Sequence, residues 1–77
     1  MTYRMIDQMA TGKHIKELCK AKGIKPKMIA NVMGFESVTA IYKWFEGHSL
    51  PQIDNLLILA YIFGVTIDEL IVRKYAK

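Results

Sequence analysis

The chain has 77 residues, of which 52% are apolar, and a formal net charge of +4, so it can form one small domain with a single core. Cys19 is the single cysteine, which excludes an internal disulfide and favours a reducing cytoplasm. The longest apolar run, residues 56–63, is far shorter than the roughly 20 residues of a membrane span. Because the first 13 residues also lack the apolar stretch of a secretion signal, we expect a cytoplasmic protein without a membrane partner.

The first half of the chain predicts two short helices after a flexible N-terminal arm. Residues 1–11 show no clear periodicity, and Thr11 is a plausible N-cap. Apolar residues then recur at helical spacing up to Gly23, a residue typical of helix C-termini. A second helix begins at Pro26, where proline suits the first turn, and ends at Gly34.

The second half predicts three more helices. Ser37 is the candidate N-cap of the third helix, at about residues 37–46. A fourth helix covers about residues 52–63, and Thr66 caps a last short one. No segment alternates long enough to predict a strand.

These elements together predict an all-α fold of five short helices. We expect one domain at residues 12–72, with a tail at 73–77. Its second and third helices are short and are joined by a brief turn, which is a helix-turn-helix pattern. In the third helix, Ile41 and Trp44 are expected to face inward.

Charge is distributed unevenly along the chain. Residues 13–27 contain six lysines against Glu17, whereas residues 36–69 contain Lys43 against five acidic residues. A basic half of this kind suggests a polyanion as the partner. A solvated, lysine-rich helix face would produce the same pattern.

Four segments resemble one known family in their order and spacing. These are "IKELCKAKGI", "MIANVMGF", "AIYKWFEGHSLP" and "IDNLLILAYIFGVTIDELIV", which together cover about residues 12–72. They are similar to the phage-repressor type of helix-turn-helix domain, the XRE or Cro/C1 group. The resemblance implies a lambda-repressor-like fold and a bacterial transcription regulator that binds double-stranded DNA.

The resemblance also implies where DNA would be contacted, because such domains lay the third helix in the major groove. On this reading, Lys43 reaches guanine and Thr39 offers a methyl group or a hydroxyl to a base. The implied base contacts are Val38, Thr39 and Lys43. The implied phosphate contacts are Lys13, Lys25, Lys27, Tyr42, His48 and Ser49. Without the resemblance, Tyr42 and Lys43 are also consistent with ordinary exposed helix residues.

The chain departs from the family pattern in ways that bear on its affinity for DNA. Pro26 stands where the family often has a phosphate-anchoring glutamine, and Thr39 stands where the subgroup tends to have another glutamine. Glu36 and Glu46 flank the third helix and would repel nearby phosphates. These departures predict modest affinity for one subunit.

Apolar residues in excess of the needs of a small core predict an interface for a second copy. They lie in the fourth helix and near the C-terminus, and the predicted interface residues are Ile58, Tyr61, Ile62, Ile71, Val72 and Tyr75. Such a homodimer would place two third helices in adjacent major grooves. A slightly apolar monomer surface is the alternative.

No catalytic, metal or cofactor site is expected. Cys19 and His14 are five residues apart and do not share a helix face well, and a paired cysteine motif is absent from the sequence. Cys19 is better explained as a small buried residue. We therefore expect neither an enzyme nor a small-molecule substrate.

Two functions from different classes fit the sequence. The first is a sequence-specific regulator, most simply a repressor, that acts as a homodimer. The second is a protein-interaction module on the same fold, such as an antitoxin or an adaptor, and the acidic flanks of the third helix favour it.

Overall fold

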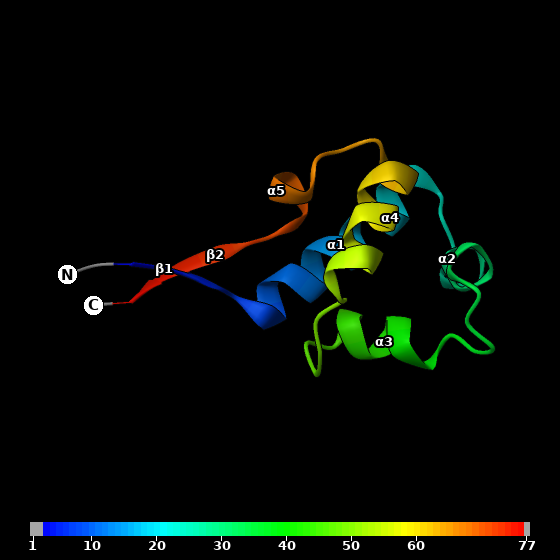
Figure 1. Ribbon diagram of the computed structural model, residues 1–77, viewed down its shortest axis with the longest axis horizontal. Coiled ribbons are helices and arrows are strands. Elements are labelled where there is room, and N and C mark those ends of the chain that lie inside the picture. The colour runs from blue at the N-terminus through cyan, green and yellow to red at the C-terminus, as the bar shows by residue number, and fades with distance from the viewer. Residues whose placement is uncertain (1–2, 77) are drawn as a thin grey trace.

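The computed structural model describes residues 3–76, which form five helices and a two-stranded ribbon (Figure 1). All five helices predicted from the sequence are present. In chain order the elements are β1 (Tyr3–Ile6), α1 (Gln8–Lys22), α2 (Pro26–Met33), α3 (Thr39–Phe45), α4 (Ile53–Phe63), α5 (Ile67–Leu70) and β2 (Arg73–Ala76). None of the helices within residues 3–76 combines the length and the apolar character needed to cross a membrane.

Local signals place the helix ends that surround the helix-turn-helix segment. Gly34 ends α2 in the left-handed conformation with φ of 75°, which lets its N–H bond to the carbonyls of Ala30 and Asn31. Pro26 occupies the first turn of α2, where a missing N–H costs nothing. These residues hold α2 and α3 as two short helices joined by a tight corner.

The first helix begins earlier than the sequence suggested. Asp7, not Thr11, is the N-cap of α1, and its carboxylate accepts a hydrogen bond of 3.0 Å from the N–H of Ala10. Thr11 is fully buried inside α1. Its hydroxyl accepts a hydrogen bond of 3.0 Å from the N–H of Val72 and donates to the carbonyl of the same residue. The prediction of Thr11 as a cap was wrong because its partner lies 61 residues away.

The expected arm and tail pair with each other. Strands β1 and β2 are antiparallel, with Ile6 opposite Arg73 and Met5 opposite Lys74. The range 1–11 therefore holds β1 and the start of α1, and most of the range 73–77 is β2; Met1, Thr2 and Lys77 lie outside the described residues. The prediction of no strand was wrong because four-residue strands are too short to show a period. The ribbon extends away from the helices along the longest axis (Figure 1).

The core lies where the five helices meet. Each helix contributes at least one side chain that is nearly or fully inaccessible to solvent. These residues are Ile15, Cys19, Ile29, Ala30, Ile41, Trp44, Leu59, Ala60, Phe63 and Leu70. The core therefore fixes the orientation of α3 against the other four helices.

Candidate nucleic-acid interface

The inner side of α3 is anchored in the core. Ile41 is fully buried and Trp44 is 4% exposed, as the spacing of the third helix predicted. The Phe35 ring meets the Trp44 ring edge-on at a centroid distance of 6.0 Å. Gly12 of α1 also lies so close to α3 that a Cβ atom there would be 1.8 Å from the Trp44 carbonyl oxygen. These contacts leave α3 little freedom to rotate.

The outer side of α3 faces solvent. Thr39, Tyr42 and Lys43 are exposed, whereas Val38 is half-buried and packs against the core. The structure starts α3 at Thr39, whose N–H donates to the Ser37 hydroxyl oxygen at 3.3 Å. The Ser37 hydroxyl in turn donates to the Thr39 hydroxyl oxygen at 3.1 Å. The Thr39 hydroxyl can therefore still donate a hydrogen bond to a ligand beyond the helix.

Lysines gather around the beginning of α2. Lys13, Lys25 and Lys27, the lysines predicted to contact phosphates, are all exposed. The structure adds Lys16 and Lys20 of α1, which line one surface hollow together with Lys25 and Tyr42. The sequence shows that Lys16 and Lys20 are one helical turn apart, but not that they face Tyr42. This juxtaposition concentrates positive charge beside the outer side of α3.

Two N–H groups of the loop after α3 are already bonded within the protein. The N–H of His48 donates to the Lys43 carbonyl at 2.9 Å, and the N–H of Gly47 donates to the Trp44 carbonyl at 3.1 Å. The His48 side chain is exposed, with its Nε2 atom 3.8 Å from the Glu46 carboxylate. Ser49 is half-buried. In this loop, side chains rather than the N–H groups of Gly47 and His48 remain for a partner.

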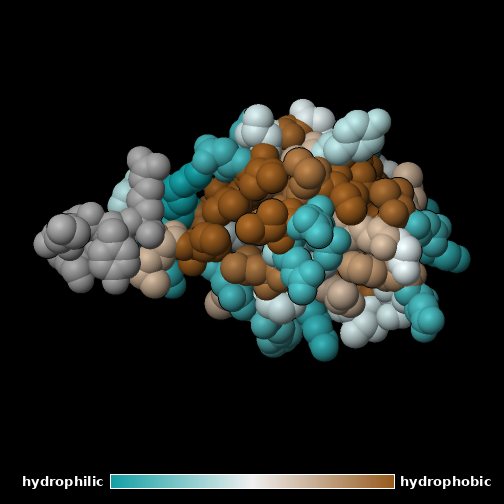
Figure 2. All heavy atoms as spheres, in the orientation of Figure 1, coloured by the Kyte–Doolittle hydropathy of each residue, from teal (hydrophilic) through white to brown (hydrophobic). Residues whose placement is uncertain are grey.

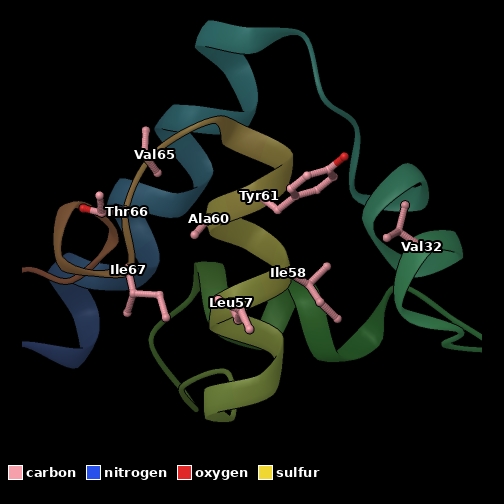
Figure 3. A pocket seen from close by; sticks show the side chains of 8 residues that line it. All are labelled: Val32, Leu57, Ile58, Ala60, Tyr61, Val65, Thr66 and Ile67. Carbon is pink, nitrogen blue, oxygen red and sulfur yellow. The ribbon is translucent and has the colours of Figure 1, made fainter.

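The predicted interface residues of the second half do not form one surface. Ile58 and Tyr61 line an apolar groove of about 860 Å³ between α2, α4 and the start of α5, shown in Figure 3. Ile62 packs against the core instead. Ile71 and Val72 are half-buried between α5 and the ribbon, and Tyr75 is exposed on β2.

The groove also contains residues that were not predicted to lie at an interface. Leu57 is 62% exposed, Tyr61 is 88% exposed, and Val32 joins them from α2. Figure 2 shows that hydrophobic residues gather on one face of the helical body. The excess of apolar residues is visible in the sequence, whereas the position of Val32 beside α4 is not.

Comparison with known proteins decides the family. The helix-turn-helix family HTH_3 matches residues 15–70, which is most of the chain. The chain belongs to the helix-turn-helix family. This family consists of DNA-binding regulators, and the motif binds double-stranded DNA. The resemblance inferred from the four sequence segments is therefore confirmed.

Two solved structures have the same arrangement of helices. The restriction-modification controller protein C.AhdI from Aeromonas hydrophila has a TM-score of 0.72 and 25% identity, covering 83% of this chain and 96% of that one. The DNA-binding domain of BldD has a TM-score of 0.68 and 15% identity, covering 84% of this chain and 93% of that one. Both support the lambda-repressor-like fold. No curated protein sequence matches the chain.

Proposed function

We propose that the protein is a sequence-specific transcription regulator that reads the DNA major groove with α3. The observation that carries this proposal is the division of α3 into two sides. Ile41 and Trp44 fix one side in the core, while Thr39 and Lys43 are exposed on the other. A rigid helix with exposed polar side chains near its N-terminus suits base recognition in the major groove. The similarity to C.AhdI, a restriction-modification controller protein, supports the regulatory role.

Within this proposal, base and phosphate contacts come from different residues. Lys43 reaches guanine acceptors, and the Thr39 hydroxyl donates to a base, whereas half-buried Val38 has a lesser part. The phosphate contacts are Lys13, Lys25, Lys27, Tyr42, His48 and Ser49, with Lys16 and Lys20 added by their position beside Tyr42. Glu46 lowers the contribution of His48, because its carboxylate lies beside the imidazole. A repressor role needs no further activity, since an occupied site excludes other DNA-binding proteins.

Selection of duplexes from a random pool tests base reading. The wild-type protein should enrich one motif. Thr39→Ala or Lys43→Ala should weaken binding to that motif by about 1–3 kcal/mol and relax the choice of base at one position. Lys22→Ala is the matched control, because Lys22 is exposed and is not among the proposed contacts with bases or phosphates. A uniform loss of affinity, with the motif intact, would restrict Thr39 and Lys43 to backbone contacts.

We also propose that the protein acts as a homodimer through the groove beside α4. The exposed apolar side chains of Leu57 and Tyr61 stand next to a groove of matching apolar character. Two copies related by a two-fold axis can each place Tyr61 in the groove of the other. The dimer would present two α3 helices to half-sites about 34–36 Å apart. Ile62 is left out of this interface because it packs inward, as are Ile71, Val72 and Tyr75, which lie outside the groove.

Sedimentation tests the dimer. Tyr61→Lys places a charge on the groove and should give folded monomers with reduced DNA affinity. Ile53→Lys is the matched control, because Ile53 is 78% exposed on the same helix and lies outside the groove lining. A wild-type chain that remains monomeric at high micromolar concentration would rule out this pairing.

A protein-interaction module on the same fold is the second candidate. Glu36 and Glu46 are exposed on either side of α3, where they oppose phosphate binding. Under this alternative, the groove beside α4 would take a different protein. The same duplex selection separates the two candidates, since an interaction module would enrich no motif.

A further inference from the structure

A second hollow lies between α1, α2 and α3, on the side that α3 exposes. It has a volume of about 330 Å³, at the small end of the range for ligand pockets. The end of α1 forms one wall, the α1–α2 connection forms the next, and Tyr42 and Phe45 of α3 close the third. The two aromatic rings meet edge-on at a centroid distance of 5.7 Å, which gives this wall a fixed shape.

The lining of the hollow is largely apolar, whereas the lining of a site for phosphate alone would be polar. Cys19, Ile24 and Phe45 contribute to its lining, and Cys19 is only 5% exposed. Burial raises the pKa of the Cys19 thiol, which therefore stays neutral. Pro26 adds an apolar ring to the same lining.

The charged groups of the lining all have one sign. Lys16, Lys20 and Lys25 stand around the apolar surface, and the described lining contains no Asp or Glu. A ligand that fits must therefore combine an apolar body with a negative head. Such a molecule gains from burial of its body and from ion pairs with ammonium groups.

We propose that this hollow binds an amphipathic anion, a carboxylate with an aromatic or medium-length acyl body, and that the bound ligand competes with DNA. The competition rests on the proposed function, because the hollow shares four residues with the proposed phosphate contacts, namely Lys16, Lys20, Lys25 and Tyr42. A ligand at ten times its dissociation constant would weaken DNA binding roughly tenfold if the two exclude each other. The regulator would then release its site when the anion accumulates.

The site itself is tested without DNA, by NMR titration of ¹⁵N-labelled protein with decanoate and with 2-naphthoate. The largest amide shifts are expected at Cys19, Ile24 and Tyr42. Decanol, which keeps the apolar body, and acetate, which keeps the head, should each bind at least about tenfold more weakly, a difference of roughly 1.4 kcal/mol. Shifts centred on Leu57 and Tyr61 would place binding in the α4 groove, and the absence of saturable binding by both carboxylates would also overturn the site.

Variants separate the two parts of the recognition. Lys16→Gln combined with Lys20→Gln should weaken decanoate binding at least about tenfold. The control is Lys13→Gln combined with Lys22→Gln, which removes the same charge from the same helix outside the hollow. Pro26→Gln should weaken decanoate binding without weakening DNA binding. Equal effects of the two lysine pairs would overturn the proposed head-group site.

Competition is measured by titrating decanoate into a complex with the selected duplex. Displacement by decanoate, but not by acetate at equal ionic strength, is expected. Binding in the hollow without displacement would overturn the competition. A protein that binds no duplex would refute the proposed function, and the titration without DNA would still decide the ligand site.

Discussion

Replacement of Gly12 by alanine should force α1 and α3 apart. A Cβ atom at this position would lie 1.8 Å from the carbonyl oxygen of Trp44 and 3.2 Å from that of Phe45. Both oxygens belong to the backbone, so a change of side-chain rotamer cannot relieve the contact. One helix must move until the first distance reaches at least 3.0 Å. Because Ile41 and Trp44 are fixed in the core, this movement also disturbs their packing.

Two opposing effects determine how much stability the Gly12→Ala protein loses. Alanine in a helix interior is more stable than glycine by about 1 kcal/mol. Overpacking costs about 1–3 kcal/mol, and more where backbone has to shift. Since this clash involves backbone on both sides, we expect the cost of overpacking to exceed the gain in helix propensity by about 2 kcal/mol or more. A small domain has a free energy of unfolding of only about 5 kcal/mol or slightly more.

Urea unfolding, followed by Trp44 fluorescence and by circular dichroism, measures this loss. Lys13→Ala is the control, because Lys13 is the exposed neighbour of Gly12 in the same helix and its replacement should change stability by less than about 0.5 kcal/mol. A Gly12→Ala protein as stable as the wild type would refute the close approach of α1 to α3. It would also undermine the fixed orientation of α3 on which base reading depends.

Three further perturbations test other parts of the molecule. Lys25→Gln combined with Lys27→Gln should weaken binding to all duplexes. The slope of the logarithm of the binding constant against the logarithm of salt concentration should become shallower by about two. An unchanged slope would mean that the two lysines do not face DNA. Thr11→Val should lower the free energy of unfolding by about 1–3 kcal/mol, because the Val72 N–H loses its hydrogen-bond partner. Thr11→Ser is the control, since it keeps the hydroxyl. Equal stability of the two variants in thermal unfolding would contradict this role of Thr11. Hydrogen bonds from the backbone and side chain of Thr66 lower the pKa of Glu69 from its ordinary 4.5. The carboxylate therefore stabilises the fold above pH 4.5, and this contribution is lost as the pH falls through the lower pKa of the folded state. Glu69→Gln should accordingly be less stable than the wild type at neutral pH, and a gap in melting temperature that persists in acid would refute the assignment.

The sequence by itself determined the elements whose signals are local. Gly23 and Gly34 end their helices and Pro26 begins one, because each residue acts through its own backbone conformation. The capping box of Thr66 and Glu69 lies within three residues and marks α5. The spacing of Ile41 and Trp44 likewise separates the inner from the outer side of α3, because helical periodicity alone assigns them. The candidate reading residues followed from that periodicity and from the family resemblance.

Only the tertiary structure decided which distant segments meet. Thr11 looked like a helix cap because its preferred local role is capping, yet its hydroxyl bonds to Val72 at the far end of the chain. The two strands became visible only as a pair, since each is too short to show a pattern of its own. Lys16 and Lys20 join Tyr42 around one hollow because α1 and α3 cross there. Contacts of this kind depend on the packing of whole helices, and helical spacing within one segment does not encode that packing.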